Sequence, residues 1–243
     1  MPKLAGAATR TIVAMGGGGF SMEPDNPLLD DHVLALARKR RGHERPSVCF
    51  LPTASGNTDS DVAQFYAAFA RRCEATHLDL FARRVADLES FLLDQDAVYV
   101  GGGNTANMLA IWRVHGLDRA LKRAWEAGVV LAGLSAGSNC WFEGSTTDSF
   151  GTLAALKDGL GLVPGSHSPH YHSEPGRRPT FQHLIASGEL PDGLAADDGA
   201  ALVFVGTELA EVVASGPLAR AYRVVRGPTG GAIETELPTR YLG

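Results

Sequence analysis

The sequence is poor in cysteine, in long apolar runs and in positive charge, and each shortage argues against a class of protein. Its three cysteines, Cys49, Cys73 and Cys140, include no CxxC pair, which suits free thiols in a reducing compartment and offers no metal-ligand spacing. The apolar stretch at residues 11–15 is shorter than the roughly 7–15 residues of a signal-peptide core or the roughly 20 of a membrane span. We therefore expect a cytoplasmic protein with no membrane partner.

The charge balance is acidic, with a formal net charge of −5. A general nucleic-acid binder needs a basic face to neutralise phosphates, so we expect no nucleic-acid partner, although a local basic pocket for an acidic substrate stays compatible with this charge. Hydrophobic residues make up 44% and charged residues 20% of the 243 residues, as in a soluble globular protein with a sizeable core. Because no linker or repeat interrupts residues 1–243, we expect one domain, and a homodimer is compatible with the sequence.

Short β-branched apolar runs alternate with stretches of helical periodicity through the first two thirds of the chain. This order predicts an α/β fold with a mostly parallel sheet covered by helices on both faces. Short strands separated by turns follow, which predicts a β-rich C-terminal extension of the same sheet. The expected strands are 11–15, 47–51, 77–81, 97–100, 129–134, 200–205, 210–215 and 221–225, and the helical stripes are 29–37, 62–73, 105–112 and 117–125.

Three glycine-containing loops follow expected strands, at residues 16–19, 101–103 and 133–137. Since ligands bind at the carboxyl ends of parallel strands, we expect these loops to form one site. The first loop departs from a dinucleotide fingerprint, because Ser21 occupies the place of the third glycine and residues 36–41 supply no acidic residue. We expect no cofactor there, but a loop whose backbone approaches a substrate, or a plain turn.

The second and third loops carry chemistry of their own. Glycines at 101–103 let backbone N–H groups point into a cleft and stabilise an oxyanion, although the same segment suits a helix entry capped by Asn104 or Thr105. The third loop reads Gly-Leu-Ser-Ala-Gly, the Gly-x-Ser-x-Gly pattern of a nucleophile elbow. In such an elbow a sharp strand-to-helix turn exposes the serine oxygen, here that of Ser135.

A serine nucleophile needs a base, and the base needs an orienting acid. Three of the eight histidines cluster at His167, His170 and His172. Their His-x-x-His-x-His spacing matches neither the helical nor the CxxC spacing of metal ligands, so we expect no metal. Asp148 lies between Ser135 and this cluster, so the chain order allows Ser…Asp…His.

Taken together, these motifs resemble the peptidase E family of serine peptidases, the aspartyl dipeptidases with cyanophycinase as a relative. The resemblance covers nearly the whole chain and implies a three-layer, flavodoxin-like α/β sandwich of the class I glutamine amidotransferase type. It also implies hydrolysis of short peptides, most of all dipeptides with an N-terminal aspartate, through an acyl-enzyme. The segments that carry it are 50–55, 101–105, 134–138, 146–148 and 169–171.

The resemblance assigns the catalytic roles residue by residue. Ser135 corresponds to the nucleophile and His170 to the general base. Asp148 corresponds to the acid that orients the imidazole, although the family places one more residue between its Thr-Thr pair and the acid. Glu174, close to His170 in the sequence, and Asp198, just before an expected strand, are alternative acids.

The resemblance also implies oxyanion donors and substrate contacts. The backbone N–H groups of Gly103 and Ala136 correspond to the oxyanion hole. A substrate aspartate needs a cation, and a guanidinium pairs with a carboxylate in a bidentate way. Arg178 matches the family's substrate-binding arginine better than its neighbour Arg177, although the two are also compatible with a solvated surface pair. Asn104 is a second candidate contact.

Two alternatives stay open at this point. One is a cyanophycinase-like or broader-specificity peptidase on the same scaffold, and the other is a non-catalytic ligand-binding member of the fold. Glutamine amidotransferases of class I use a cysteine nucleophile, and we interpret Cys140 as a core thiol.

Overall fold

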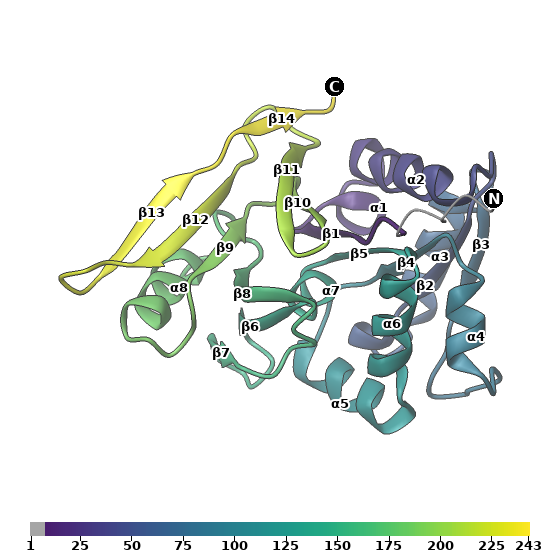
Figure 1. Cartoon of the computed structure of the whole chain (residues 1–243), viewed down its shortest axis with the longest axis horizontal. Helices are drawn as coiled ribbons and strands as arrows, with labels where there is room; N and C mark the ends of the chain where they lie inside the picture. Colours follow the sequence, from purple (N-terminus) through teal and green to yellow (C-terminus); the bar gives the residue numbers. More distant parts are fainter. Residues whose placement is uncertain (1–7) are drawn as a thin grey trace, which may run out of the picture.

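The computed structural model describes residues 8–243, so residues 1–7 of the expected domain lie outside the described part. The larger of its two sheets has eight strands and runs through the molecule (Figure 1). In spatial order its strands are β14 (Thr239–Tyr241), β11 (Glu208–Ala214), β10 (Ala200–Val205), β1 (Thr11–Met15), β5 (Val130–Leu134), β4 (Ala97–Val100), β2 (Ser47–Leu51) and β3 (Glu74–His77).

The five strands from β1 to β3 in this order are parallel, and β1, β4 and β5 are buried along their whole length. Strands covered on both faces read as continuous apolar runs, which is how they appear in the sequence. Successive residues serve opposite faces, so Ile12 and Ala14 join one core while Val13 and Met15 join the other. The central sheet is therefore the middle layer of three.

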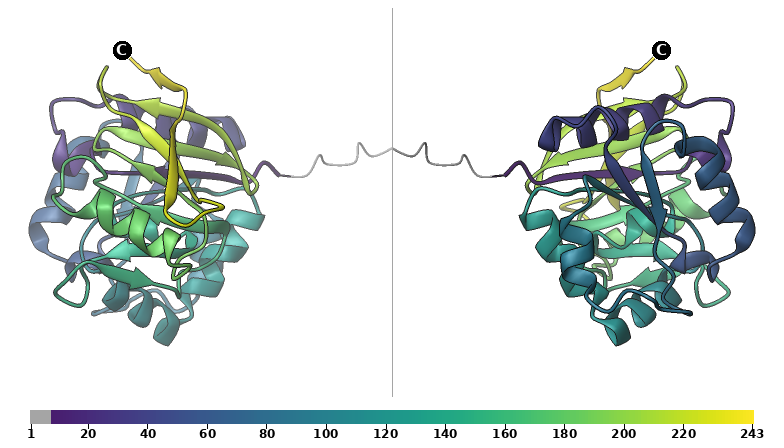
Figure 2. Two further views of the ribbon diagram at one scale, coloured as in Figure 1. Left: turned by 90° about the vertical axis from the view of Figure 1, so that its left-hand side faces the viewer. Right: turned by 90° about the vertical axis from the view of Figure 1, so that its right-hand side faces the viewer.

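Helices cover both faces of this sheet, as the side views show, with α2 above it and α5 and α6 below it (Figures 1 and 2). Residues of the first three helices pack in the core of Val13, and those of the next three in the core of Ile12. The predicted α/β sandwich is therefore confirmed. The helices are α1 (Gly19–Met22), α2 (Leu28–Arg41) and α3 (Asp59–Phe69) on one face, and α4 (Leu88–Leu93), α5 (Thr105–His115) and α6 (Leu117–Glu126) on the other.

A second sheet of six strands lies beside the first and was not expected. Strands β10 and β11 extend the main sheet as predicted, but the expected strand 221–225 pairs with β9 in the second sheet. Phe142 of the second sheet packs edge-to-face against Phe204 of β10, with ring centroids 5.7 Å apart. The two sheets therefore share a core. In spatial order the strands are β13 (Ala232–Glu236), β12 (Ala221–Arg226), β9 (Gly193–Ala196), β8 (Val163–Ser168), β6 (Phe142–Thr147) and β7 (Ala154–Leu156).

Three short or peripheral elements complete the fold. They are the 3₁₀ turn η1 (Thr53–Ser55), the helix α7 (Ala136–Asn139) that follows β5, and α8 (Arg177–Ala186), which packs against the β12–β13 hairpin (Figure 1). None of the helices within residues 8–243 combines the length and apolar character needed to cross a bilayer.

Candidate active site

Ser135 is the single residue between β5 and α7, and its backbone is strained. Its φ of 54° and ψ of −114° lie where non-glycine residues are rare, at a typical cost of ~1–3 kcal/mol. The turn is held by the N–H of Ser135, which donates to the carbonyl of Met15 at 3.2 Å. A Cβ on Gly133 would lie 2.3 Å from the Gly137 carbonyl oxygen, and a Cβ on Gly137 would lie 2.3 Å from the Val100 carbonyl oxygen. The flanking glycines of the motif are thus required by contact, and the serine side chain is presented at the end of the strand.

His170 follows β8 and also has a positive φ, of 52°. Its N–H donates to the carbonyl of Gly16 at 3.1 Å, and its Nδ1 lies 2.5 Å from Asp198 Oδ1. Because an ionised carboxylate only accepts hydrogen bonds, Nδ1 carries the proton and Nε2 is the nitrogen left for another partner. Ser135 and His170 line one cavity.

Asp198 lies in the loop between β9 and β10 and is the carboxylate that hydrogen-bonds to His170. Partial burial would raise the pKa of Asp198, but hydrogen bonds from His170 and Ser173 and the charge of Arg177 outweigh it and lower the pKa. Asp198 is therefore ionised at neutral pH. An ionised carboxylate at Nδ1 fixes the imidazole ring and stabilises its protonated form.

The glycine loop after β1 connects these residues. Gly16 accepts from His170, and Gly17 accepts from the N–H of Gly199 at 3.1 Å and forms a bridge with Asp198. A Cβ on Gly16 would lie 2.3 Å from the Ala196 and Asp197 carbonyl oxygens. The loop is thus a closely packed backbone support that holds the serine, the histidine and the aspartate.

Replacing Gly17 by alanine should displace the His170–Asp198 pair. The new Cβ would lie 2.1 Å from Asp198 Oδ1 and 3.0 Å from His170 Cε1, and a shift of ~1 Å at a reacting group costs about 100-fold in rate. We expect a loss of that size in kcat/KM. Gly216 is the matched control, because a Cβ there meets nothing within 4 Å. Equal activity of the two variants in a peptidase assay would contradict the supporting role of Gly17.

The structure does not bring the other two candidate acids to His170. Asp148 lies in an exposed turn, where its carbonyl accepts from Gly151 at 2.8 Å. Glu174 accepts instead from Arg177 Nε at 2.6 Å. Within residues 8–243 neither carboxylate hydrogen-bonds to His170, so the geometry favours Asp198 over Asp148 as the orienting acid.

His167 and His172 are separate from this pair. Complete burial lowers the pKa of His167 to about 3, so its ring is neutral. Its Nδ1 donates to the Leu194 carbonyl at 3.0 Å, and its Nε2 lies 3.0 Å from the hydroxyl of Ser138, which also contacts the Ser135 carbonyl at 2.8 Å. Since His172 is exposed, the three histidines face different partners. No group of three or more metal-binding side chains occurs in the part of the chain that the structure describes.

Of the two predicted oxyanion donors, Ala136 directly follows Ser135 in the chain, and Gly103 does not line the cavity at Ser135. The N–H groups of Ala136 and Gly103 donate no hydrogen bond among residues 8–243. Gly102, in the middle of the predicted glycine loop, comes close to the serine, because a Cβ there would lie 3.4 Å from Ser135 Cβ. Asn104 is occupied as the cap of α5: its side chain accepts from the Asn107 N–H at 2.9 Å and donates to the Ser149 carbonyl at 3.0 Å.

The two adjacent arginines have different environments. Arg177 is buried, and besides Glu174 it contacts the Thr146 carbonyl at 3.0 Å. Arg178 is half-exposed and pairs through Nε and a terminal nitrogen with Glu234 of β13. Its guanidinium also lies 5.6 Å from the Tyr171 ring centre, above the ring face. Each guanidinium thus has a protein partner, and the site of Arg178 is built to hold a carboxylate.

The cavity at Ser135 has a volume of about 250 Å³ and is mostly apolar. One carboxylate, that of Asp61 in α3, was not foreseen from the sequence, where it reads only as an acidic residue in the first turn of a helix. The lining residues are Phe20, Ser21, Met22, Phe50, Asp61, Gly101, Gly102, Leu134, Ser135 and His170.

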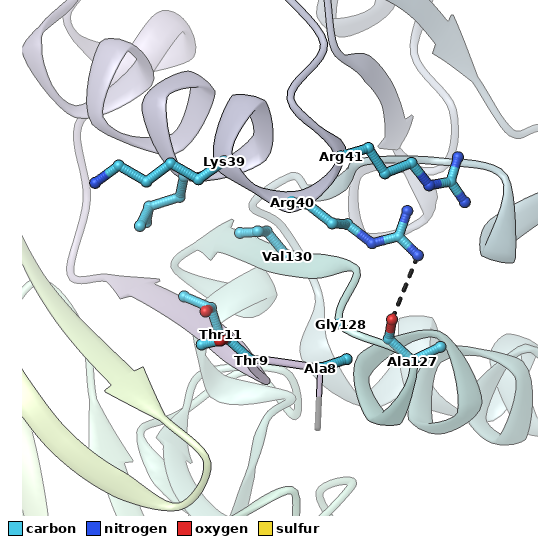
Figure 3. A pocket seen from close by; sticks show the side chains of 10 residues that line it. Ala8, Thr9, Thr11, Lys39, Arg40, Arg41, Ala127, Gly128 and Val130 are labelled. Carbon is cyan, nitrogen blue, oxygen red and sulfur yellow. Dashed lines mark hydrogen bonds between the residues drawn. The ribbon is translucent and has the colours of Figure 1, made fainter. Parts of the chain in front are cut away.

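A basic cavity does exist, but at the opposite edge of the sheet, beside the first residues of β1 and β5 (Figure 3). Arg40 donates to the carbonyls of Gln95 at 2.7 Å and Ala127 at 3.4 Å, and Arg41 donates to Asp94 and Leu93. Both arginines therefore cap the carboxyl end of α4, and Arg40 also caps that of α6. This cavity shares no lining residue with the cavity at Ser135.

A three-layer α/β sandwich with a serine at a strand-to-helix turn and a histidine–carboxylate pair beside it defines a hydrolase-type site. The family model described as peptidase family S51 matches residues 12–212, and the chain belongs to this peptidase family. It is 49% identical over 235 residues to the "uncharacterized peptidase YgaJ" of Bacillus subtilis (strain 168), covering 96% of this chain and 100% of that protein. It is 31% identical over 148 residues to the peptidase E of Citrobacter koseri, covering 58% and 62% of the two chains.

Two solved structures share the fold. A peptidase from an acI-B1 Actinobacterium aligns with a TM-score of 0.66 and 17% identity, covering 96% of this chain and 98% of that one. A putative peptidase E protein from Listeria monocytogenes EGD-e aligns with a TM-score of 0.58 and 19% identity, covering 95% and 100%. The resemblance read from the sequence motifs is therefore confirmed at the level of family and fold.

Proposed function

We propose that this peptidase is a serine peptidase of short peptides, with Ser135 as nucleophile, His170 as general base and Asp198 as the acid that orients it. One observation carries the proposal: the strained serine, His170 and Asp198 are held by the consecutive residues 15–17 at the end of β1, and Ser135 and His170 line one cavity. Cleavage of short peptides places its products in the same compartment as the enzyme. The buried, free thiols of all three cysteines support a reducing compartment, the cytoplasm.

The proposed reaction follows from the proton positions. Ser135 Oγ attacks the peptide carbonyl carbon while its proton passes to His170 Nε2. The C–N bond breaks as Nε2 protonates the leaving amine, and the acyl group stays on the serine as an ester. Water then attacks the ester, giving one proton to Nε2, which returns it to Oγ. The N–H groups of Ala136 and Gly103 stabilise the oxyanion in both steps, and losing one such donor typically costs ~3–4 kcal/mol.

Labelling with a fluorophosphonate tests this assignment without knowledge of the substrate. The reagent reacts with serines whose hydroxyl is activated by a neighbouring base. Intact mass spectrometry should show one adduct on the wild-type protein. Mass spectrometry after proteolysis should place this adduct on the peptide that contains Ser135. An unlabelled wild-type protein would support a non-catalytic member of the fold instead.

For the substrate we propose dipeptides with an N-terminal aspartate, read by Arg178. Partial burial would raise the pKa of Glu234, but hydrogen bonds from Tyr171, Gln182 and Arg178 outweigh it and lower the pKa. Glu234 is thus ionised and holds Arg178 in the two-pronged geometry that suits a carboxylate. A substrate aspartate would take the place of this internal carboxylate.

Replacing Glu234 by glutamine should raise the preference for Asp-X over Leu-X dipeptides. The uncharged amide competes less well for Arg178, so we expect the ratio of the two kcat/KM values to rise about three- to tenfold. Glu236→Gln on the same strand is the control, since Glu236 pairs with Arg220 at 3.2 Å. If Glu234→Gln changed both substrates equally, Arg178 would not be the residue that reads aspartate.

A peptidase of broader specificity, including the cyanophycinase-like type, is the second candidate. It is favoured by the pairing of Arg178 with Glu234 and by the cavity at Ser135, whose ten lining residues include no lysine or arginine. Hydrolysis rates for Asp-X, Leu-X and β-linked aspartyl-arginine peptides separate the candidates.

A further inference from the structure

The cavity at Ser135 contains one carboxylate that the proposed chemistry does not use. Phe20, Met22, Phe50 and Leu134 form its apolar wall, and Asp61 adds a negative charge. The remaining lining residues bring no positive charge except through protonation of His170. A carboxylate beside an apolar wall attracts a cation, because the low dielectric of the wall strengthens the attraction.

Asp61 has no partner that would explain its charge. It is half-buried in the first turn of α3, and its carboxylate makes no hydrogen bond or ion pair within residues 8–243. An acidic residue in the first turn stabilises a helix through its dipole. Asp59 occupies the same turn and supplies the same effect, but it is exposed and lines no part of the cavity. The helix dipole therefore explains an aspartate at either position, but it does not explain why Asp61 lines the cavity.

Resting on the proposed function, we propose that Asp61 binds a primary ammonium group of the peptide substrate. The α-ammonium of an N-terminal residue is two bonds from the carbonyl carbon that Ser135 attacks, so it enters this cavity whenever the first peptide bond is presented. The ε-ammonium of a lysine side chain lying along the apolar wall has the same chemistry. With the α-ammonium as ligand, Asp61 restricts cleavage to the first bond of a peptide. With the ε-ammonium, it selects a basic residue before the scissile bond.

The test measures binding as well as cleavage, with Asp61→Asn and the matched control Asp59→Asn. Titration calorimetry with the Ser135→Ala protein, alone and combined with each change, gives Kd values for Asp-Leu, Lys-Leu and the N-acetylated form of each. The same peptides give KM and kcat with Ser135 intact. We expect Asp61→Asn to weaken binding of free-amine peptides about tenfold, with little effect on kcat, while Asp59→Asn changes neither.

These peptides identify the source of the ammonium group. If the α-ammonium is the ligand, acetylation weakens binding to the parent protein and abolishes the difference in affinity between the parent protein and the Asp61→Asn protein. If the side chain is the ligand, Lys-Leu binds best and keeps that difference after acetylation of its α-amine. Equal affinities of the parent protein and the Asp61→Asn protein for every peptide would overturn the inference.

Failure of the inference and failure of the proposed function give different results. Cleavage that is indifferent to acetylation and to Asp61→Asn leaves the peptidase in place and overturns the role of Asp61. Amine-dependent binding without cleavage or fluorophosphonate labelling supports Asp61 and overturns the serine mechanism. Absence of both binding and cleavage overturns both.

Discussion

The Ser135→Ala protein is expected to lose at least roughly 10⁴-fold in kcat on any peptide that the wild-type protein cleaves, because no acyl-enzyme can form. Its fold should be unaffected. Ser135 Oγ makes no hydrogen bond within the described range, residues 8–243, and alanine tolerates the strained backbone no worse than serine does. The melting temperature should therefore stay within about 2 °C, as measured by circular dichroism beside the hydrolysis assay.

Ser138→Ala is the control for this change, because Ser138 lies in the same short helix. Its hydroxyl is buried and lies 2.8 Å from the Ser135 carbonyl and 3.0 Å from the neutral ring of His167, so its loss leaves a buried acceptor unpaired at a cost of ~1–3 kcal/mol. We expect this variant to melt at a lower temperature with a far smaller loss of activity. Wild-type hydrolysis by Ser135→Ala would show that another group performs the attack.

The elbow could be predicted from the sequence because its geometry is local. A buried strand, two glycines and a serine within five residues determine the turn. The structure shows why both glycines are needed: a Cβ on Gly133 would lie 2.3 Å from the Gly137 carbonyl oxygen, and a Cβ on Gly137 would lie 2.3 Å from the Val100 carbonyl oxygen. The central parallel strands could be predicted for the same reason, since each is a short continuous apolar run in the sequence. The second sheet could not be predicted in this way, because the alternation of apolar and polar residues in a strand such as β12 does not specify which strand it pairs with.

The acid behind His170 depends on contacts between segments far apart in the sequence. Asp148 was predicted because it follows the Thr-Thr pair of the family motif, but it lies just after the end of β6 and is exposed. Asp198 reaches His170 only because Gly17 bridges to it and Gly199 bonds back to the first loop. The pairing of Arg178 with Glu234 depends likewise on the β12–β13 hairpin folding over α8 (Figure 1). The spacing of residues along the sequence does not predict such contacts between distant segments.

Asp198→Asn is the second change for which we expect a large effect, a fall in kcat of about 10³- to 10⁴-fold. An asparagine amide directed at Nδ1 donates a hydrogen bond, so Nδ1 becomes an acceptor and the neutral ring carries its proton on Nε2. In that tautomer His170 cannot take the proton of Ser135. Because Asp198 acts through His170, KM should change less than about threefold while kcat falls.

Asp148→Asn is the matched comparison, since it makes the same chemical change at the acid that the family resemblance assigned. Its carboxylate is exposed, and we expect its kcat to stay within about twofold of the wild-type value. The two variants, assayed side by side on one peptide, separate the candidates because each predicts loss at one position only. A large fall in kcat for Asp148→Asn with Asp198→Asn unaffected would mean that His170 turns to Asp148 when substrate binds. The 2.5 Å contact between His170 and Asp198 would then belong to the resting protein and not to catalysis.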